Sequence, residues 1–230
     1  MKRFWKSVAV AQAGEGWAIR LDERPVKTPA RVPLALSTEA LAEAVAEEWR
    51  SVGEKIDPRD MPLTGLANAA IDRVEPARQL FAKDLARYAE ADLACYRAEG
   101  PPALVARQEE RWDKLLGWAR RRYDVDFTTT SGLMHVDQPA ATVERLAHAV
   151  TALDAFRLAA LQPLVTISGS LIAALAVQEK AIAADEAWEA VSVDDRWQLE
   201  QWGADAEAEA ALENRRRDFL AAARFLELLD

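Results

Sequence analysis

The residues best suited to metal or nucleophilic chemistry are few and widely spaced in this chain. Zinc sites use about four Cys, His or carboxylate ligands at set spacings, and the chain has one cysteine, Cys95, and two histidines, His135 and His148. Nucleophilic catalysis by Ser or Cys needs a histidine base within reach. His148 lies in a predicted helix and His135 in an irregular connection. We therefore expect no metal site and no catalytic residue, with Cys95 as a small core residue.

Phosphate chemistry has no motif to support it. The sequence lacks a glycine-rich loop followed by Lys-Ser/Thr, and it lacks G-x-G-x-x-G after a strand. The net charge of -9 also argues against nucleic acid, whose affinity comes largely from Lys and Arg. Two dense basic runs, Arg120–Arg122 and Arg215–Arg217, lie among acidic residues in helix-like segments. We interpret them as solvated helix faces, with contacts to a partner or to phosphate as the alternative. We expect no nucleotide, no cofactor and no nucleic-acid partner.

Tryptophan is the residue that stands out, with eight in the chain. Its large apolar area and polar N–H make it common in protein interfaces. Trp197 and Trp202 lie in Asp194–Gly203, a segment crowded with charge, and five residues separate them by about 140° on a helix. One indole can therefore pack inward while the other meets a partner. The core is the expected place for Trp49, Trp112 and Trp188.

The elements that would position these residues begin with strands. Apolar and polar residues alternate over 7–10 and 17–21, and Pro29 and Pro33 interrupt the extended chain that follows. Thr38 is a good N-cap for a helix whose apolar residues recur at helical spacing as far as Val52. These patterns predict a small β meander with one helix.

After residue 57 nearly every segment predicts a helix. Prolines 62, 76, 102 and 139 mark helix starts, and Pro163 is expected to separate one helix from the apolar run Leu164–Val177. That run is apolar on all sides, which predicts a central buried helix. A last helical stretch, Asp194–Leu229, is expected to bend near Gly203. We predict an N-terminal α+β domain over 1–57 and a mainly α helical bundle domain over 58–230.

Three features of the sequence bear on its compartment. The N-terminal residues lead directly into the strand pattern, without the apolar core of a secretory signal or the Arg- and Ser-rich stretch of a transit peptide. The most apolar run, 164–177, is too short to span a bilayer. A single free thiol fits a reducing compartment. We expect a cytoplasmic protein without membrane insertion.

Short motifs in a fixed order run along nearly the whole chain. They are Phe4-Trp5, Leu21–Pro29, Leu41-Ala42 through Glu48-Trp49, Met61–Thr64, Ala70–Asp72, Asp92–Arg97, and Gln198 through Gly203 with Asp205. With these motifs the sequence resembles the ATP synthase assembly chaperones that act on the alpha subunit of the F-type catalytic head, found in mitochondria and in alphaproteobacteria. Glu23 departs from the family pattern, which usually has glycine there. We expect a bacterial member, because no presequence pattern precedes the first strand.

This resemblance implies both a fold and a function. The fold is an N-terminal α+β domain followed by an orthogonal helical bundle, and the function is to shield the apolar interface of the alpha subunit until the beta subunit replaces the chaperone. Eukaryotic relatives would work in the mitochondrial matrix. The family's functionally sensitive carboxylate falls at Asp194, with Asp195, Gln198 and Trp202 as neighbours in the partner-binding site, and Trp49 has a structural role in the core.

Two other classes of function remain open from the residues alone. One is a small-molecule enzyme that uses carboxylates in a helical cleft, which predicts a pocket containing acids of perturbed pKa. The other is an adaptor subunit of a different complex. The resemblance favours a chaperone that is not an enzyme.

Overall fold

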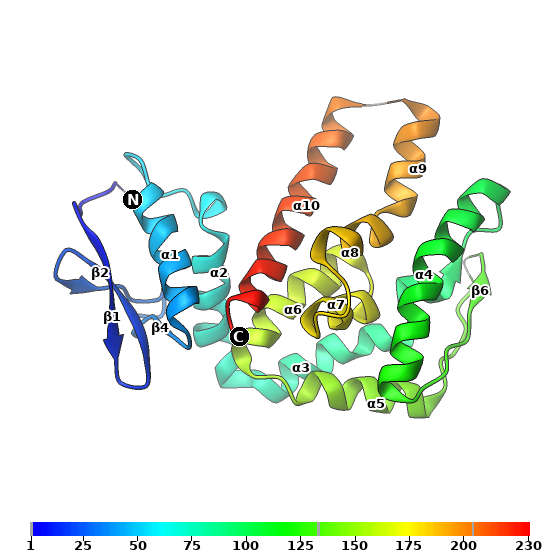
Figure 1. The fold of residues 1–230 in the computed structure, drawn as a ribbon, viewed down its shortest axis with the longest axis horizontal. Helices are drawn as coiled ribbons and strands as arrows, with labels where there is room; N and C mark the ends of the chain where they lie inside the picture. Colours follow the sequence, from blue (N-terminus) through cyan, green and yellow to red (C-terminus); the bar gives the residue numbers. More distant parts are fainter. Residues whose placement is uncertain (1, 133, 204) are drawn as a thin grey trace. The chain divides into compact units, whose positions relative to one another are not determined.

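The computed structural model of this chain describes residues 2–132, 134–203 and 205–230 (Figure 1). Contacts divide it into two compact units. Unit 1 comprises Met1–Arg78, Asp154–Ala160 and Arg224–Asp230, and unit 2 comprises Gln79–Leu153 and Leu161–Ala223. The domain boundary between residues 57 and 58 stays a prediction.

Unit 1 contains the predicted β meander. Strands β1 (Val8–Ala13) and β2 (Gly16–Leu21) pair antiparallel, and β3 (Arg24–Pro25) and β4 (Ala35–Leu36) each pair antiparallel with β2. Asp22 takes the left-handed position of the turn after β2, with φ of 54°. Aspartate tolerates this conformation better than most residues. Positive φ is therefore not required of Glu23, the residue that departs from the family glycine.

Helix α1 (Glu39–Ser51) packs on this meander and begins at the predicted cap, because the Thr38 hydroxyl accepts the N–H of Leu41 at 3.1 Å. Glu48 on α1 accepts the N–H groups of Leu63 and Thr64 at 2.7 and 2.8 Å. These are unpaired donors at the start of α2 (Pro62–Ala69), so one carboxylate joins the two helices. The buried face of α1 consists of Leu41, Ala42, Val45, Ala46 and Trp49.

The rest of the chain is mainly helical, which confirms the predicted fold class. Strands β5 (Tyr96–Arg97) and β6 (Thr130–Ser131) form a short parallel pair. The remaining helices are α3 (Arg78–Ala86), α4 (Pro102–Tyr123), α5 (Ala140–Thr151), α6 (Ala155–Ser168), α7 (Leu171–Gln178), α8 (Ala184–Val191), α9 (Val193–Trp202) and α10 (Ala206–Glu227). Short 3-10 or π-helical segments cover Pro58–Asp60, Ala70–Val74, Glu75–Ala77, Arg87–Glu90 and Leu93–Cys95.

The expected helix break at Pro163 is wrong. Helix α6 continues through Pro163 to Ser168, and the break falls at Gly169, where φ is +69°. Proline removes one hydrogen bond but keeps a helical φ, whereas a left-handed residue ends the helix. The predicted apolar helix over 164–177 is therefore divided between the end of α6 and α7. The prediction of a buried central segment holds for α7, whose residues Leu171 to Val177 are all buried.

A buried carboxylate fixes the start of α7 within unit 2. Asp92 is fully buried and accepts the Ser170 hydroxyl at 2.8 Å, the N–H of Ile172 at 2.9 Å and the N–H of Ala94 at 3.0 Å. Burial raises the pKa of Asp92 to about 6, although these donors favour the charged form. Among the described residues, no helix is both long and apolar enough to cross a bilayer.

The first prediction concerns Trp49, which is buried in unit 1 with its ring 5.3 Å from that of Trp5. We expect Trp49→Arg to lower the free energy of unfolding by about 3–5 kcal/mol, because it leaves an unpaired charge in an apolar site. Chemical denaturation measures the loss. The matched control is Trp49→Phe, which keeps an apolar aromatic side chain, although a smaller one, and loses no hydrogen bond, since the indole N–H has no partner among the described residues. Equal stability of the arginine variant and the wild type would contradict the core role.

The second prediction uses Asp92→Asn, which removes the titration but keeps the shape. A rise in pKa from 3.8 to about 6 means that the folded state binds the proton more tightly than the unfolded state does. The stability of the wild type relative to the variant should therefore fall by roughly 3 kcal/mol between about pH 4 and pH 6, and then level off. Denaturation of both proteins across this range gives the difference. A difference that increased with pH would show that the hydrogen-bond donors outweigh the cost of burial.

Candidate partner-binding site

Helix α9 carries the predicted site, and polar contacts rather than burial hold it in unit 2. Val193 is its one buried residue. On the side facing α4, the half-buried Asp194 accepts a hydrogen bond from Gln108 Nε2 at 2.7 Å. Arg107 of α4 forms an ion pair with Glu200 at 2.7 Å. Such exposed pairs contribute little each, so α9 depends on several of them together.

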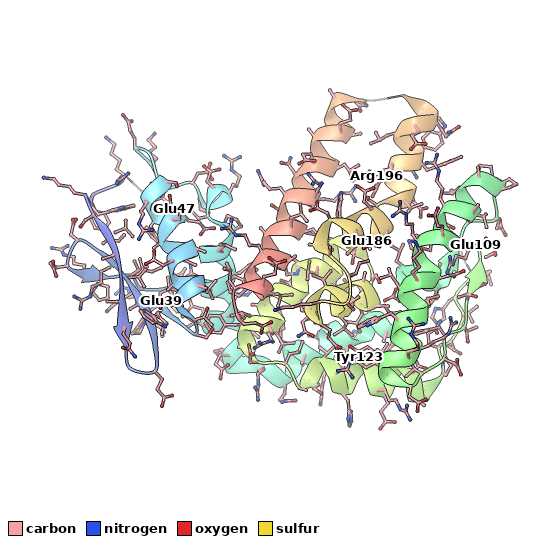
Figure 2. The ribbon with its side chains drawn as sticks, in the orientation of Figure 1. Glu39, Glu47, Glu109, Tyr123, Glu186 and Arg196 are labelled. Carbon is pink, nitrogen blue, oxygen red and sulfur yellow. The ribbon has the colours of Figure 1, made fainter. Side chains whose placement is uncertain are left out.

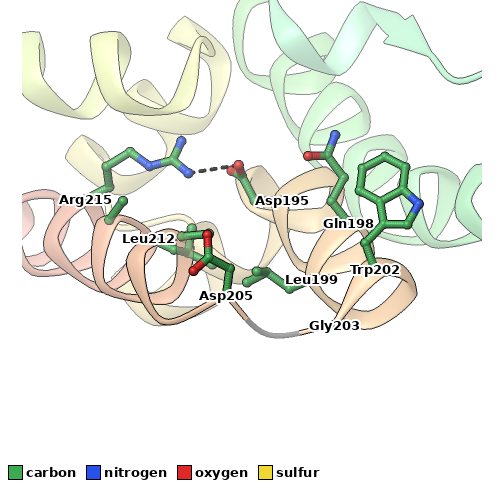
Figure 3. Close-up of a pocket in the computed structure, with 10 residues that line it drawn as sticks. Asp195, Gln198, Leu199, Trp202, Gly203, Asp205, Leu212 and Arg215 are labelled. Atoms are coloured by element: carbon green, nitrogen blue, oxygen red, sulfur yellow. Dashed lines mark hydrogen bonds and ion pairs between the residues drawn. The ribbon is translucent and has the colours of Figure 1, made fainter.

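The other side of α9 is tied to α10 and α8 in the same way. Asp195 pairs with Arg215 of α10 at 2.8 Å (Figure 3). Arg196, labelled in Figure 2, pairs with Glu189 of α8 at 2.5 Å. Gly203 ends α9 with φ of +86°, so the long predicted helix over 194–229 is two helices, α9 and α10. The expected bend is in fact a complete break.

The two tryptophans of α9 differ in their surroundings. Trp197 is half-buried, and the guanidinium of Arg107 lies 4.9 Å from its ring centroid. Trp202 is 81% exposed, the highest exposure among the large hydrophobic residues that the structure describes. An indole that is this exposed to water offers an apolar surface to which another molecule can bind.

A groove runs along each side of α9. The α9–α10 groove has a volume of about 430 Å³ and is lined by Asp195, Gln198, Leu199, Trp202, Leu212 and Arg215, among others (Figure 3). The α4–α9 groove has a volume of about 560 Å³ and is lined by Glu99, Leu104, Gln108, Asp194, Gln198 and Trp202, among others. Gln198 and Trp202 line both grooves, so they form a ridge between them.

All four residues predicted for partner binding lie at this double groove. Asp194 faces the α4 side, Asp195 faces the α10 side, and Gln198 and Trp202 belong to both. Sequence reasoning missed the residues of α4 and α10 that complete the grooves, above all Gln108, Leu212 and Arg215. No local pattern marks Gln108 and Leu212, because they meet α9 only in the folded chain. Arg215 belongs to the basic run that we interpreted as a solvated helix face, and it instead lines the groove and pairs with Asp195.

The residues first considered for chemistry lie elsewhere. Cys95 is buried, and burial raises the pKa of its thiol to about 12, so the thiolate is not formed at neutral pH. His135 lies at the surface between the Tyr96 hydroxyl, 3.1 Å from Nδ1, and Asp137, 3.2 Å from Nε2. His148 is exposed on α5. Within the described part of the chain, no three His, Cys, Asp or Glu residues are grouped to hold a metal ion.

Comparison with known proteins identifies the family. The model of the ATP12 chaperone protein family matches residues 2–120. Mitochondrial protein atp12 of Schizosaccharomyces pombe is 25% identical over 214 residues, which cover 88% of this chain and 74% of that protein.

Solved structures extend the similarity to the whole chain. Atp12 from Paracoccus denitrificans and an aspartate-to-lysine mutant of it are each 44% identical, with a TM-score of 0.94 over 100% of this chain and 98% of theirs. A candidate chaperone from Agrobacterium tumefaciens is 39% identical, with a TM-score of 0.94 over 100% of this chain and 86% of its own. The family match covers more than half of the residues and the structural match covers all of them, so the chain belongs to the ATP12 chaperone family, the ATP synthase assembly chaperones that its sequence resembles.

Proposed function

We propose that this chaperone binds the unassembled alpha subunit of the F-type ATP synthase catalytic head through the surface formed by α9. The observation that carries the proposal is Trp202, an 81% exposed indole on the ridge between two grooves. Central aromatic residues often supply most of the binding energy of an interface. We place this activity in the bacterial cytoplasm, before the alpha subunit pairs with the beta subunit.

The proposed site suits a partner that must later be released. An unpaired subunit exposes apolar surface that aggregates unless it is covered. The chaperone must bind the alpha subunit more weakly than the beta subunit does, so that the beta subunit can replace it. The exchange then depends on the difference between these two affinities. Few side chains of α9 are apolar, and Leu199, Trp197 and Trp202 are spread over its two sides. Mass action then suffices for the exchange, without nucleotide hydrolysis.

The enzyme hypothesis finds less support at this surface. A carboxylate in a helical cleft would serve as an acid or base if its pKa were perturbed. Asp92 has such a pKa, but it is fully buried and lines neither groove. Glu48 also has a raised pKa, caused mainly by burial, and it caps α2 in unit 1. Each of these acids has a structural role in its own unit.

The third prediction tests Trp202 directly. We expect Trp202→Ala to weaken binding of purified alpha subunit by about thirtyfold, the effect of removing an interface anchor worth about 2 kcal/mol. Its melting temperature should stay within about 2 °C of the wild type, because the indole is exposed. Leu80→Ala is the matched control, since Leu80 is 64% exposed and lies outside both grooves. Wild-type affinity of the Trp202 variant would remove the central support for the proposal.

The fourth prediction separates the charge of Asp194 from its hydrogen bond. We expect Asp194→Lys to retain the fold, with a modest loss of stability from the broken link to Gln108, and to leave co-expressed alpha subunit insoluble. Asp194→Asn is the control, because its carbonyl oxygen still accepts from Gln108. It should melt like the wild type and chaperone partially. Full solubility of the alpha subunit with the lysine variant would refute a role for this carboxylate in binding.

A further inference from the structure

We propose that the segment of the partner that docks on α9 is basic and amphipathic, with Lys or Arg side chains facing the carboxylates of the two grooves and an apolar side chain between α9 and α10. This inference rests on the proposed function, because it specifies the chemistry of the partner at the same surface. Charge, apolar lining and the exposed indole each contribute to the argument.

The cations that line the grooves are already paired. Arg97 donates to Asp113 at 2.6 Å and lies over the ring of Trp112, with only 9% of its surface exposed. Arg215 donates to Asp195 at 2.8 Å. Both guanidinium groups thus have a carboxylate partner within the protein, and Nε and Nη1 of Arg97, which have no hydrogen-bond partner among the described residues, are buried.

Three carboxylates of the same grooves have no such partner. Asp194 accepts from the neutral amide of Gln108, and Asp205 accepts the N–H of Glu207 at 3.2 Å. Glu99 is exposed at the mouth of the α4–α9 groove. In the part of the chain that the structure describes, no Lys, Arg or His forms an ion pair with any of these three. The grooves thus present an excess of negative charge around Trp202.

The chain around the ridge adds to this field. Residues 197–214 contain no Lys or Arg, and Asp205, Glu207 and Glu209 in this stretch form no ion pair among the described residues. Glu200 and Glu213 pair with Arg107 and Arg216. The protein as a whole has a net charge of -9. Charge of one sign at a concave surface concentrates ligands of the opposite sign and accelerates their association. An acidic partner, a nucleic acid or an anionic membrane would be repelled at this face. A second copy of the chain would bring the same negative surface against itself.

The apolar residues of the site indicate that the docking segment carries apolar side chains as well as basic ones. Leu199 and Leu212, with Ala208 and Ala211, line the α9–α10 groove, whose volume of about 430 Å³ can receive a large side chain (Figure 3). The exposed face of Trp202 can take a Lys or Arg side chain by a cation–π contact. Arg107 already uses the ring of Trp197 in this way, at 4.9 Å. A segment with both basic and apolar residues could place its basic side chains against the groove carboxylates and the Trp202 ring, and an apolar side chain against the leucines and alanines of the α9–α10 groove.

The first test measures binding of the purified full chain to purified alpha subunit at several salt concentrations. Between about 0.02 and 0.5 M NaCl we expect the dissociation constant to increase at least about tenfold, mainly through slower association, because salt screens exposed charges. Binding that is tight at both extremes would overturn this inference and leave the proposed function standing. Absence of binding at every salt concentration would overturn the proposed function itself.

The second test assigns the effect to the groove carboxylates. Glu99→Lys and Asp205→Asn should each weaken binding about three- to tenfold at low salt, with the difference disappearing at high salt. Asn keeps an oxygen acceptor for the N–H of Glu207 at the start of α10. The control is Glu144→Lys, an exposed residue of α5 outside both grooves with the same change in net charge as Glu99→Lys. Equal weakening by this control would show a general effect of net charge and would overturn the assignment.

The third test identifies the docking segment with overlapping peptides that cover the alpha subunit. We expect binding to concentrate in peptides that combine Lys or Arg with large apolar residues, and to be lost with the Trp202→Ala variant. Preference for neutral or acidic apolar peptides would overturn the inference. Sedimentation of the chain alone supplies the remaining check, since a dimer that Trp202→Ala abolishes would mean that the surface is occupied by a second copy.

Discussion

The attachment of α9 by polar side chains is the constraint on which the proposed site depends. A helix held by an apolar stripe would have to bury its tryptophans against its neighbours. Helix α9 buries only Val193 and is secured instead by Gln108 to Asp194 on one side and by Arg215 to Asp195 on the other. Trp202 is thereby left exposed for another molecule. Because each polar link contributes little alone, a single charge change should weaken the attachment of the helix only modestly.

Other helices of unit 2 are held in the opposite way, by the burial of apolar side chains. Asp92 fixes the start of α7, whose side chains are buried from Leu171 to Val177, and the Trp112 indole of α4 donates to the Ala190 carbonyl of α8 at 2.7 Å. A buried carboxylate costs solvation free energy, which the surrounding donors offset only in one geometry. Helices α4 and α8, which contact α9, are therefore held by contacts that do not involve α9.

Features set by neighbouring residues could be predicted from the sequence, and features set by distant contacts could not. The Thr38 cap and the alternation along β1 and β2 act within a few residues, and both were confirmed. Pro163 was misjudged because helix ends depend on backbone φ, and Gly169 rather than proline supplies the left-handed residue. The pair of Gln108 and Asp194 lies 86 residues apart in sequence, so only the fold brings it together. The tryptophans and charges of Asp194–Gly203 marked α9 as the candidate helix, but they did not mark the α4 and α10 walls of its grooves.

The combination of a charged rim and a small apolar centre has kinetic consequences for a chaperone. Electrostatic attraction mainly increases the association rate, whereas the buried apolar anchors mainly determine how long a complex lasts. A surface with uncompensated carboxylates around one exposed indole would capture a basic partner quickly and hold it briefly. A permanent subunit interface is larger and more apolar, so it then replaces the chaperone because its complex is more stable, even if that complex forms more slowly. On the proposed function, the acidic surface of α9 therefore serves early capture, and the modest apolar area around Trp202 permits the later exchange.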